Sequence, residues 1–353
     1  DYYERATFNH IRSTQHPEHG GYVYFTSARP RQHRKYSAPN MAMWCCVGTG
    51  MENHGKYNQM IFTHSKDSLF LNLFIASQLN WKEKGVEIKQ ETNFPYEEQT
   101  KLTITKGASE FNLLVRYPGW VSEGALKILI KEKEFKYNAK PSSYVSIDRK
   151  WKKGDEVQVL LPMKNTIERM NNVPDYIAIM HGPILLGAKS GTEDMGNLIA
   201  GDGRFDQYTG GKMLPIDKAP ILIDNDIENL DKKLEPIEGK PLNFKLKVKT
   251  INPIENLVLE PFYQIHDSRY QIYWLSLTDN RYEQYIDSLS KSEEERLALD
   301  SRTIDKVNTG EQQPETDHRM QSENSRTGNN FDEMYREAGR EGFFSYDMVT
   351  NGE

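Results

Sequence analysis

The feature that most constrains the fold is a series of short, strand-like segments between residues 69 and 161, each bounded by a turn. Residues 69–76 alternate with a period of two and are apolar at nearly every position, which is typical of a strand buried on both faces. Glycine-containing turns such as Lys106-Gly107 and Gly154-Asp155 separate the segments that follow. Many short strands with such turns favour a β-sandwich. The strands are expected at 85–90, 101–105, 111–117, 125–130, 144–147 and 156–161.

Later parts of the chain predict further strands, a loop and a helix. Residues 191–231 are rich in Gly, Asp and Asn and are expected to form a long functional or flexible loop. The charged stretch 281–300 predicts a helix, and the chain from Ser301 onward is polar with little periodicity. A chain of 353 residues exceeds the ~250–300 residues at which a single core stops growing, so several domains are expected. The further strands are predicted at 176–180, 184–187, 242–248, 257–259 and 270–275.

The first 65 residues predict helices rather than strands. Residues 1–14 carry apolar side chains at near-helical spacing. Thr49 and Glu52 fit a Thr-x-x-Glu capping box, which predicts a helix from about residue 50 to residue 62.

Two adjacent cysteines, Cys45 and Cys46, are the only ones in the sequence and would lie just before this helix. Neighbouring cysteines rarely bridge each other, because a disulfide needs Cα atoms about 4.4–6.8 Å apart with suitably directed side chains. A helix N-terminus favours the thiolate, which is the nucleophilic and metal-binding form of cysteine. Two interpretations therefore remain at this point: a reactive thiolate pair, or two inert buried thiols.

Zinc normally takes four ligands, so the pair alone would not complete a site. The nearby histidines and glutamates match no zinc-finger spacing, so further ligands are either among them or missing from this chain. These candidates are His10, His16, His19, His33, His54, Glu18 and Glu52.

Composition excludes two classes of protein. The formal net charge of −6 argues against a dedicated nucleic-acid binder. The sequence has no run of ~18 apolar residues, so no membrane span is expected. Aromatic residues make up 11% of the chain and suit sugar stacking, although most aromatics in folded proteins belong to the core.

Three segments carry a resemblance to a known family: residues 16–26 (HPEHGGYVYFT), 36–40 (YSAPN) and 43–57 (MWCCVGTGMENHGKY). In these the chain resembles the β-L-arabinofuranosidases of glycoside hydrolase families 127 and 146, and most closely the family 146 branch of gut Bacteroidetes. The resemblance implies an (α/α)6 barrel followed by β-sandwich domains. It further implies retaining hydrolysis through a cysteine thioglycosyl intermediate, with a glutamic acid protonating the leaving oxygen. Weaker resemblance covers β segments at 80–85, 116–120, 151–155, 180–183 and 262–270.

The resemblance also implies roles for three residues. Cys45 matches the nucleophile, which is also a ligand of Zn²⁺, and Cys46 matches the second zinc ligand of the pair. Tyr24 matches a tyrosine that lines the sugar site. The family supplies the other two zinc ligands from an upstream Glu-x-Cys segment, and the acid/base glutamate lies further upstream. No Glu-x-Cys occurs here.

The sequence is therefore expected to be a mainly β, C-terminal portion of an arabinofuranosidase that lacks most of the barrel and is inactive alone. Its partner would be a plant polysaccharide or oligosaccharide, and its location the periplasm or the exterior, by resemblance only. The alternatives are a non-catalytic carbohydrate-binding or structural β-sandwich protein with inert cysteines, and a related glycosidase acting on another sugar. The expected divisions are a helical end of the barrel at 1–64, a β-sandwich at 65–190, a second β-rich region at 191–285, and a helix with the start of a further module at 286–353.

Overall fold

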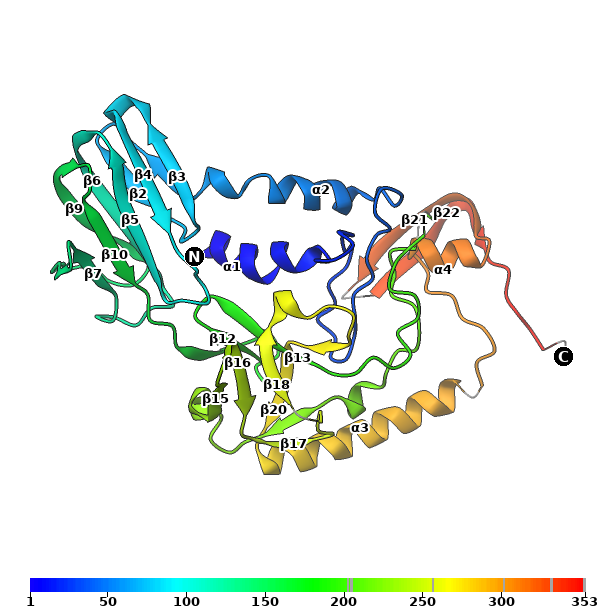
Figure 1. Ribbon diagram of the computed structural model, residues 1–353. Coiled ribbons are helices and arrows are strands. Elements are labelled where there is room, and N and C mark those ends of the chain that lie inside the picture. The colour runs from blue at the N-terminus through cyan, green and yellow to red at the C-terminus, as the bar shows by residue number, and fades with distance from the viewer. Residues whose placement is uncertain (202, 204–205, 256, 301, 331–332, 352–353) are drawn as a thin grey trace. The chain divides into compact units, whose positions relative to one another are not determined.

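The computed structural model describes residues 1–201, 203, 206–255, 257–300, 302–330 and 333–351, which fall into two compact units. The first unit is Asp1–Asn280 and the second is Arg281–Glu353. The chain is mostly β, with a short helical segment at its N-terminus (Figure 1). This confirms the predicted fold class. Among the described residues, no helix combines the length and the apolar character needed to cross a membrane.

The N-terminal segment contains two helices, α1 (Tyr2–Asn9) and α2 (Cys45–His54), together with the 3-10 turns η1 (Ile11–Thr14) and η2 (Tyr57–Gln59). Helix α1 is fixed to the first β-sandwich through its buried Glu4, whose carboxylate accepts hydrogen bonds from Arg116 at 2.5 Å and from the Trp120 indole at 2.8 Å. On its other side, Phe8 of α1 packs into the hydrophobic core formed by the sheet of residues 165–277.

Both predicted ends of the second helix, about 50 and 62, were wrong. Helix α2 begins at Cys45, with Trp44 as its N-cap, and ends at His54. Thr49 therefore lies inside the helix, where its hydroxyl donates to the Cys45 carbonyl one turn earlier, at 3.2 Å. Glu52 pairs with Lys56, one turn later, at 2.8 Å instead of closing a capping box. The Thr-x-x-Glu pattern is thus satisfied by interactions within the helix.

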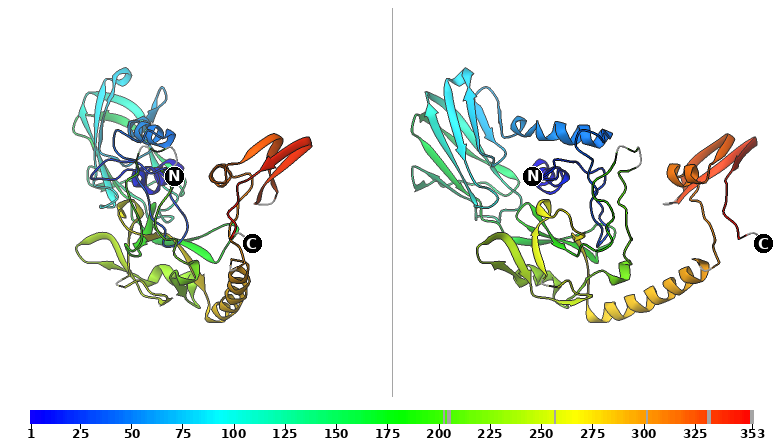
Figure 2. Two further views of the ribbon diagram at one scale, coloured as in Figure 1. Left: turned by 90° about the vertical axis from the view of Figure 1, so that its right-hand side faces the viewer. Right: turned by 45° about the vertical axis from the view of Figure 1, so that its right-hand side comes forward.

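Residues 62–160 form the predicted β-sandwich, built from a four-stranded and a six-stranded sheet (Figure 2). The sheet orders are β1-β2-β6-β9 and β3-β4-β5-β10-β7-β8. Side chains from both sheets share one core, in which Leu69, Val115, Trp151 and Val159 are fully buried. The strands are β1 (Phe62–His64), β2 (Ser68–Leu71), β3 (Ser77–Trp81), β4 (Val86–Glu91), β5 (Gln99–Lys106), β6 (Ala108–Tyr117), β7 (Lys127–Ile130), β8 (Lys133–Glu134), β9 (Ser143–Lys152) and β10 (Glu156–Leu160).

A ten-stranded sheet follows, in the order β15-β16-β18-β13-β12-β20-β14-β17, with β11 paired to β12 and β19 paired to β13. It joins strands on both sides of residue 190, because β12 pairs with β20 and β13 pairs with β18. The division predicted at 190 therefore falls within this sheet. Its strands are β11 (Asn165–Arg169), β12 (Tyr176–His181), β13 (Ile184–Lys189), β14 (Ile221–Ile223), β15 (Leu234–Ile237), β16 (Lys240–Leu246), β17 (Lys249–Ile251), β18 (Val258–Pro261), β19 (Tyr270–Gln271) and β20 (Tyr273–Leu277).

The predicted loop at 191–231 is only partly a loop. It carries β14 and two 3-10 turns, η4 (Ile216–Lys218) and η5 (Ile227–Lys233). Its first part is held by Arg269, whose fully buried guanidinium donates hydrogen bonds of 2.8 Å to the carbonyls of Glu193, Asp194 and Lys212.

After the ten-stranded sheet in the sequence, helix α3 (Asp279–Asp300) confirms the helix predicted at 281–300. The polar stretch after Ser301 contains a short helix, α4 (Gln312–Asp317), and a hairpin of β21 (Gln321–Asn330) and β22 (Glu333–Ser345), which the sequence pattern did not predict. In this second unit the buried Glu315 carboxylate accepts hydrogen bonds from Arg336, Tyr346 and the Gly310 amide. These bonds, first of all the one from Arg336, lower the pKa of Glu315 to about 2.

Candidate active site

Cys45 and Cys46 are the first two residues of helix α2. Both are free thiols; Cys45 is exposed and Cys46 is half-buried. The amides of a first helical turn have no partner within the helix, and the helix dipole favours negative charge there. The cysteines therefore lie on the helix itself, nearer to its unpaired amides than the sequence pattern predicted.

The structure brings Tyr24 and Cys45 together. The Cys45 thiol donates to the Tyr24 hydroxyl with a sulfur–oxygen separation of 4.0 Å, although the two residues are 21 positions apart. This contact, with the nearby charge of the two thiols, raises the pKa of Tyr24. Tyr24 is thus a protonated phenol beside the sulfur at neutral pH and could donate a hydrogen bond to a thiolate.

The two thiols lie in different surroundings. Burial raises the pKa of Cys46, and its hydrogen bond with Cys45 raises it further. A raised pKa keeps Cys46 in the less reactive thiol form. Of the pair, Cys45 is the sulfur open to a reactant.

Glycine at position 50 lets α2 lie against the segment that carries Tyr24. A Cβ atom at Gly50 would come within 2.5 Å of the Tyr22 ring. Tyr22 is itself fixed by the Ser37 hydroxyl, which accepts its amide hydrogen at 2.9 Å. The close approach of helix and ring thus sets the position of the 22–24 segment beside the cysteines.

Aromatic side chains flank the Cys45 site. The Tyr24 ring contacts Phe25 and Trp44, with centroid separations of 4.6 Å and 6.1 Å. Phe25 in turn contacts Tyr208 at 5.2 Å. Exposed aromatic rings beside a reactive group are suited to stacking on a sugar ring.

Tyr208 is the part of this site that the sequence pattern missed. It comes from the loop that Arg269 anchors, and it remains 51% exposed. Nothing at the position distinguishes it from other tyrosines, and only the composition of the loop pointed to a function for this region.

The other candidate ligands do not gather around the cysteines. Within the described ranges, no group of three or more His, Cys, Asp and Glu side chains is placed to hold a metal ion. His16 and His19 instead stack on each other with a ring separation of 3.9 Å, and His16 pairs with Asp267 at 2.8 Å. The Cys45–Cys46 pair thus offers two sulfur donors, whereas a closed zinc site takes four ligands.

Comparison with known structures shows what the fold is similar to. A structure described as a glycoside hydrolase matches 78% of this chain and 48% of its own, with 21% identity and a TM-score of 0.55. A GH127 β-arabinofuranosidase matches 78% of this chain and 46% of its own, with 20% identity and a TM-score of 0.52. The chain thus spans less than half the length of these two proteins, and the likeness to them shows the fold. A search of curated proteins found no match.

Family models match the chain in succession. A domain of unknown function matches residues 166–276, and a second family of unknown function matches residues 298–353. The model of the GH127 β-L-arabinofuranosidase catalytic domain matches residues 1–59, which include Tyr24 and both cysteines. The GH127 middle-domain model matches residues 68–163, which is the first β-sandwich. These two matches confirm, over residues 1–59 and 68–163, the resemblance to the GH127 β-L-arabinofuranosidases that the sequence motifs indicated.

Proposed function

We propose that this chain carries the nucleophile of a retaining β-L-arabinofuranosidase, and that the nucleophile is Cys45. The observation that carries the proposal is an accessible thiol on the first turn of α2, 4.0 Å from the Tyr24 hydroxyl, in the segment that matches the GH127 catalytic domain. Inert cysteines of a structural β-sandwich need neither exposure nor a polar partner.

The chemistry requires two displacements at one carbon. The Cys45 thiolate attacks the anomeric carbon and forms a C–S bond while the C–O bond to the leaving group breaks. The leaving oxygen takes a proton from a general acid, which is not assigned to any described residue. Water then gives up a proton to the conjugate base of that same acid and displaces the sulfur, which releases arabinose and regenerates the thiolate and the acid; the two inversions together retain the configuration. The Tyr24 hydroxyl would form hydrogen bonds with the sulfur and with the sugar. The rings of Phe25 and Tyr208 would contact the sugar from the side.

Zinc remains part of this proposal through the resemblance alone. When bound, the metal would keep a thiol deprotonated. Cys45 and Cys46 would supply two sulfur ligands, and the other two would have to come from outside the described residues. The described donor set does not make a zinc site alone, so no step is derived through the metal.

The same resemblance supports the biological setting that we propose. The substrate is a plant glycan with β-L-arabinofuranosyl ends, in the manner of the family 146 branch, and the protein is periplasmic or secreted.

Site-directed labelling tests the role of Cys45. A β-L-arabinofuranose analogue that carries an epoxide at the anomeric position should label Cys45, because the sugar portion would place the electrophile at the thiol. Peptide mass mapping should show that excess L-arabinose suppresses the labelling and that Cys45→Ala abolishes it. Cys46→Ser is the matched control and should still be labelled.

A matching epoxide without the arabinose portion separates recognition from plain thiol reactivity. If this reagent labels Cys45 as fast as the sugar analogue does, the thiol has no sugar site beside it. The chain would then be the structural protein of the alternative interpretation.

A further inference from the structure

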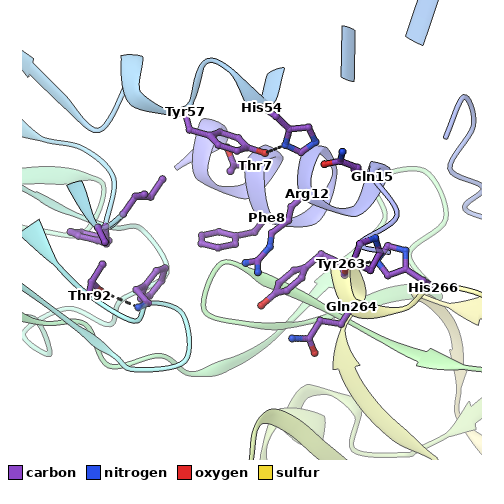
Figure 3. Close-up of a pocket in the computed structure, with 15 residues that line it drawn as sticks. Thr7, Phe8, Arg12, Gln15, His54, Tyr57, Thr92, Tyr263, Gln264 and His266 are labelled. Carbon is purple, nitrogen blue, oxygen red and sulfur yellow. Dashed lines mark hydrogen bonds between the residues drawn. The ribbon is translucent and has the colours of Figure 1, made fainter. Parts of the chain in front are cut away.

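A pocket of about 640 Å³ lies at the end of α2 opposite the cysteines (Figure 3). His54, the last residue of α2, lines it, and His54 lies nine positions after Cys45 in the sequence. At a helical rise of ~1.5 Å per residue, the pocket and the thiol are about 13 Å apart along the helix. The pocket is therefore distinct from the proposed active site. Its lining residues are Thr7, Phe8, Arg12, Gln15, Pro17, His54, Tyr57, Phe74, Ile75, Ala76, Thr92, Phe94, Tyr263, Gln264 and His266.

Aromatic rings from three distant parts of the chain form the wall of this pocket. The Phe8 ring from α1 lies 5.8 Å from Phe94 of the β-sandwich and 6.3 Å from Tyr263 of η6 (Phe262–Gln264). Phe74 contacts Phe94 at 5.9 Å. Phe8, Phe74 and Tyr263 are each less than one-tenth exposed, so the wall is rigid and apolar. Ligand pockets of ~300–1,000 Å³ with such walls normally add a few polar groups that fix the orientation of the ligand.

The charge in this pocket comes from Arg12. Its guanidinium lies over the Tyr263 ring, 4.2 Å from the centroid, and it forms no hydrogen bond or ion pair with another described residue. None of the lining residues, all of which are described, is Asp or Glu. Burial lowers the pKa of both lining histidines, that of His266 to about 4, so they are neutral at pH 7. The lining therefore carries one positive charge with no anion to balance it.

Amide groups complete the polar part of the pocket. Gln264 donates to the Tyr96 hydroxyl at 2.8 Å, which leaves its carbonyl oxygen to accept from a ligand. Figure 3 shows Gln15 and Gln264 on opposite sides of the Arg12 side chain. These groups suit a ligand that has hydrogen-bonding groups beside its charge.

We propose that this pocket binds a small carboxylate carried on a six-membered ring. The ring would lie against Phe8, Phe94 and Tyr263, and the carboxylate would pair with Arg12, whose planar fork matches two carboxylate oxygens. Two classes of molecule share this chemistry, namely sugar acids such as galacturonate and aromatic acids such as benzoate. The proposal does not depend on the role of Cys45.

Calorimetric titration of the whole chain tests this proposal. Galacturonate and benzoate are compared with their neutral counterparts, galactose and benzyl alcohol. At least one acid should bind about 10-fold or more tightly than its neutral counterpart, because a charge-assisted bond to Arg12 is lost in the latter. Tighter binding of galacturonate assigns the site to sugar acids, and tighter binding of benzoate assigns it to aromatic acids.

Variants locate the binding. Arg12→Gln should weaken binding of the acid about 10-fold or more, and Arg12→Lys less, because a lysine offers no planar fork. Arg319→Gln removes an exposed arginine of the second unit and should leave the affinity unchanged. Cys45→Ala should also leave it unchanged, which separates this site from the proposed nucleophile. Circular dichroism of each variant confirms folding; Arg12 is exposed, so its replacement should not unfold the chain.

Three results would overturn the proposal. The first is equal affinity for each acid and its neutral counterpart. The second is an Arg12→Gln variant that binds the acid as tightly as the unaltered chain does. The third is no binding of either acid at concentrations up to roughly 10 mM, which is beyond the weak end of specific binding.

Discussion

Cys45 and Cys46 are neighbours in the sequence, yet the fold gives their thiols different chemistry. Cys45 is exposed beside a tyrosine hydroxyl, whereas Cys46 is half-buried and its pKa is raised by burial. The sequence placed both cysteines near a helix start, but only the structure distinguishes them. Their difference in pKa and accessibility depends on which side chain is partly buried by the rest of the fold, and the sequence does not show this. The family resemblance predicted that Tyr24 belongs to the site. No spacing in the sequence would have paired Tyr24 with Cys45.

This difference predicts the order in which the thiols react. Iodoacetamide should modify Cys45 faster than Cys46 between pH 7 and 9, because alkylation requires the thiolate and the raised pKa of Cys46 delays its deprotonation. The rate at Cys46 should keep rising above pH 9, where its thiol finally ionises. A time course with peptide mass mapping measures both rates in one sample, with Cys46→Ser as the control for Cys45. Equal rates at every pH would contradict this prediction.

At the scale of elements, helix α2 depends on one close contact with the segment behind it. Gly50 faces the Tyr22 ring, whereas Gly48 in the same helix faces open space, since a Cβ atom there would meet no atom within 4 Å. Both glycines lower the intrinsic stability of the helix to the same extent, but only Gly50 is packed against another side chain.

Alanine at these two positions should therefore change stability in opposite directions. Gly50→Ala should lower the free energy of unfolding by about 1–3 kcal/mol, because the new methyl group overlaps the Tyr22 ring. Gly48→Ala should raise it by roughly 0.5–1 kcal/mol, since alanine is the better helix former. Urea unfolding of both variants measures the change. Equal effects would mean that α2 does not pack on Tyr22.

Local sequence patterns predicted elements well where one face is buried, and poorly elsewhere. The alternating segments at 101–105 and 111–117 became β5 and β6, because period-2 alternation follows directly from strand geometry. The hairpin β21–β22 was missed because β21 is polar throughout and the apolar residues of β22 do not alternate with a period of two. The strand predicted over 69–76 ends at Leu71, although Leu73 and Phe74 are buried, so burial there does not mean strand pairing.

At the scale of the whole molecule, the sequence predicted the order of β regions but not how the strands pair across the chain. The sheet that joins β12 to β20 brings together segments about a hundred residues apart, and such pairings leave no local signal. The family models divide the chain near residue 164, as the sheets do. The aromatic pocket was likewise invisible in the sequence, because its wall is assembled from three distant segments.

The described residues contain a candidate nucleophile, but neither a metal-binding cluster nor an assigned general acid. We therefore expect the purified chain to show no turnover of an aryl β-L-arabinofuranoside above the rate in buffer. It should also retain less than one equivalent of zinc after dialysis, because two sulfur ligands are half of a closed site. Release of the aryl group and metal analysis measure the two quantities. Turnover that Cys45→Ala abolishes would refute the expected inactivity while supporting the assigned nucleophile.

The buried carboxylate of Glu315 makes the stability of the second unit depend on pH. The carboxylate is ionised in the folded unit down to a pKa of about 2, whereas an unfolded glutamate takes up a proton near its ordinary value of 4.5. Unfolding in the intervening pH range therefore binds a proton, and by linkage the free energy of unfolding falls as the pH falls through that range. Above pH 4.5 the stabilisation from Glu315 is fully present, and as the pH drops toward 2 it is lost. A neutral or mildly acidic medium therefore leaves the full contribution of Glu315 to the free energy of unfolding of the second unit in place.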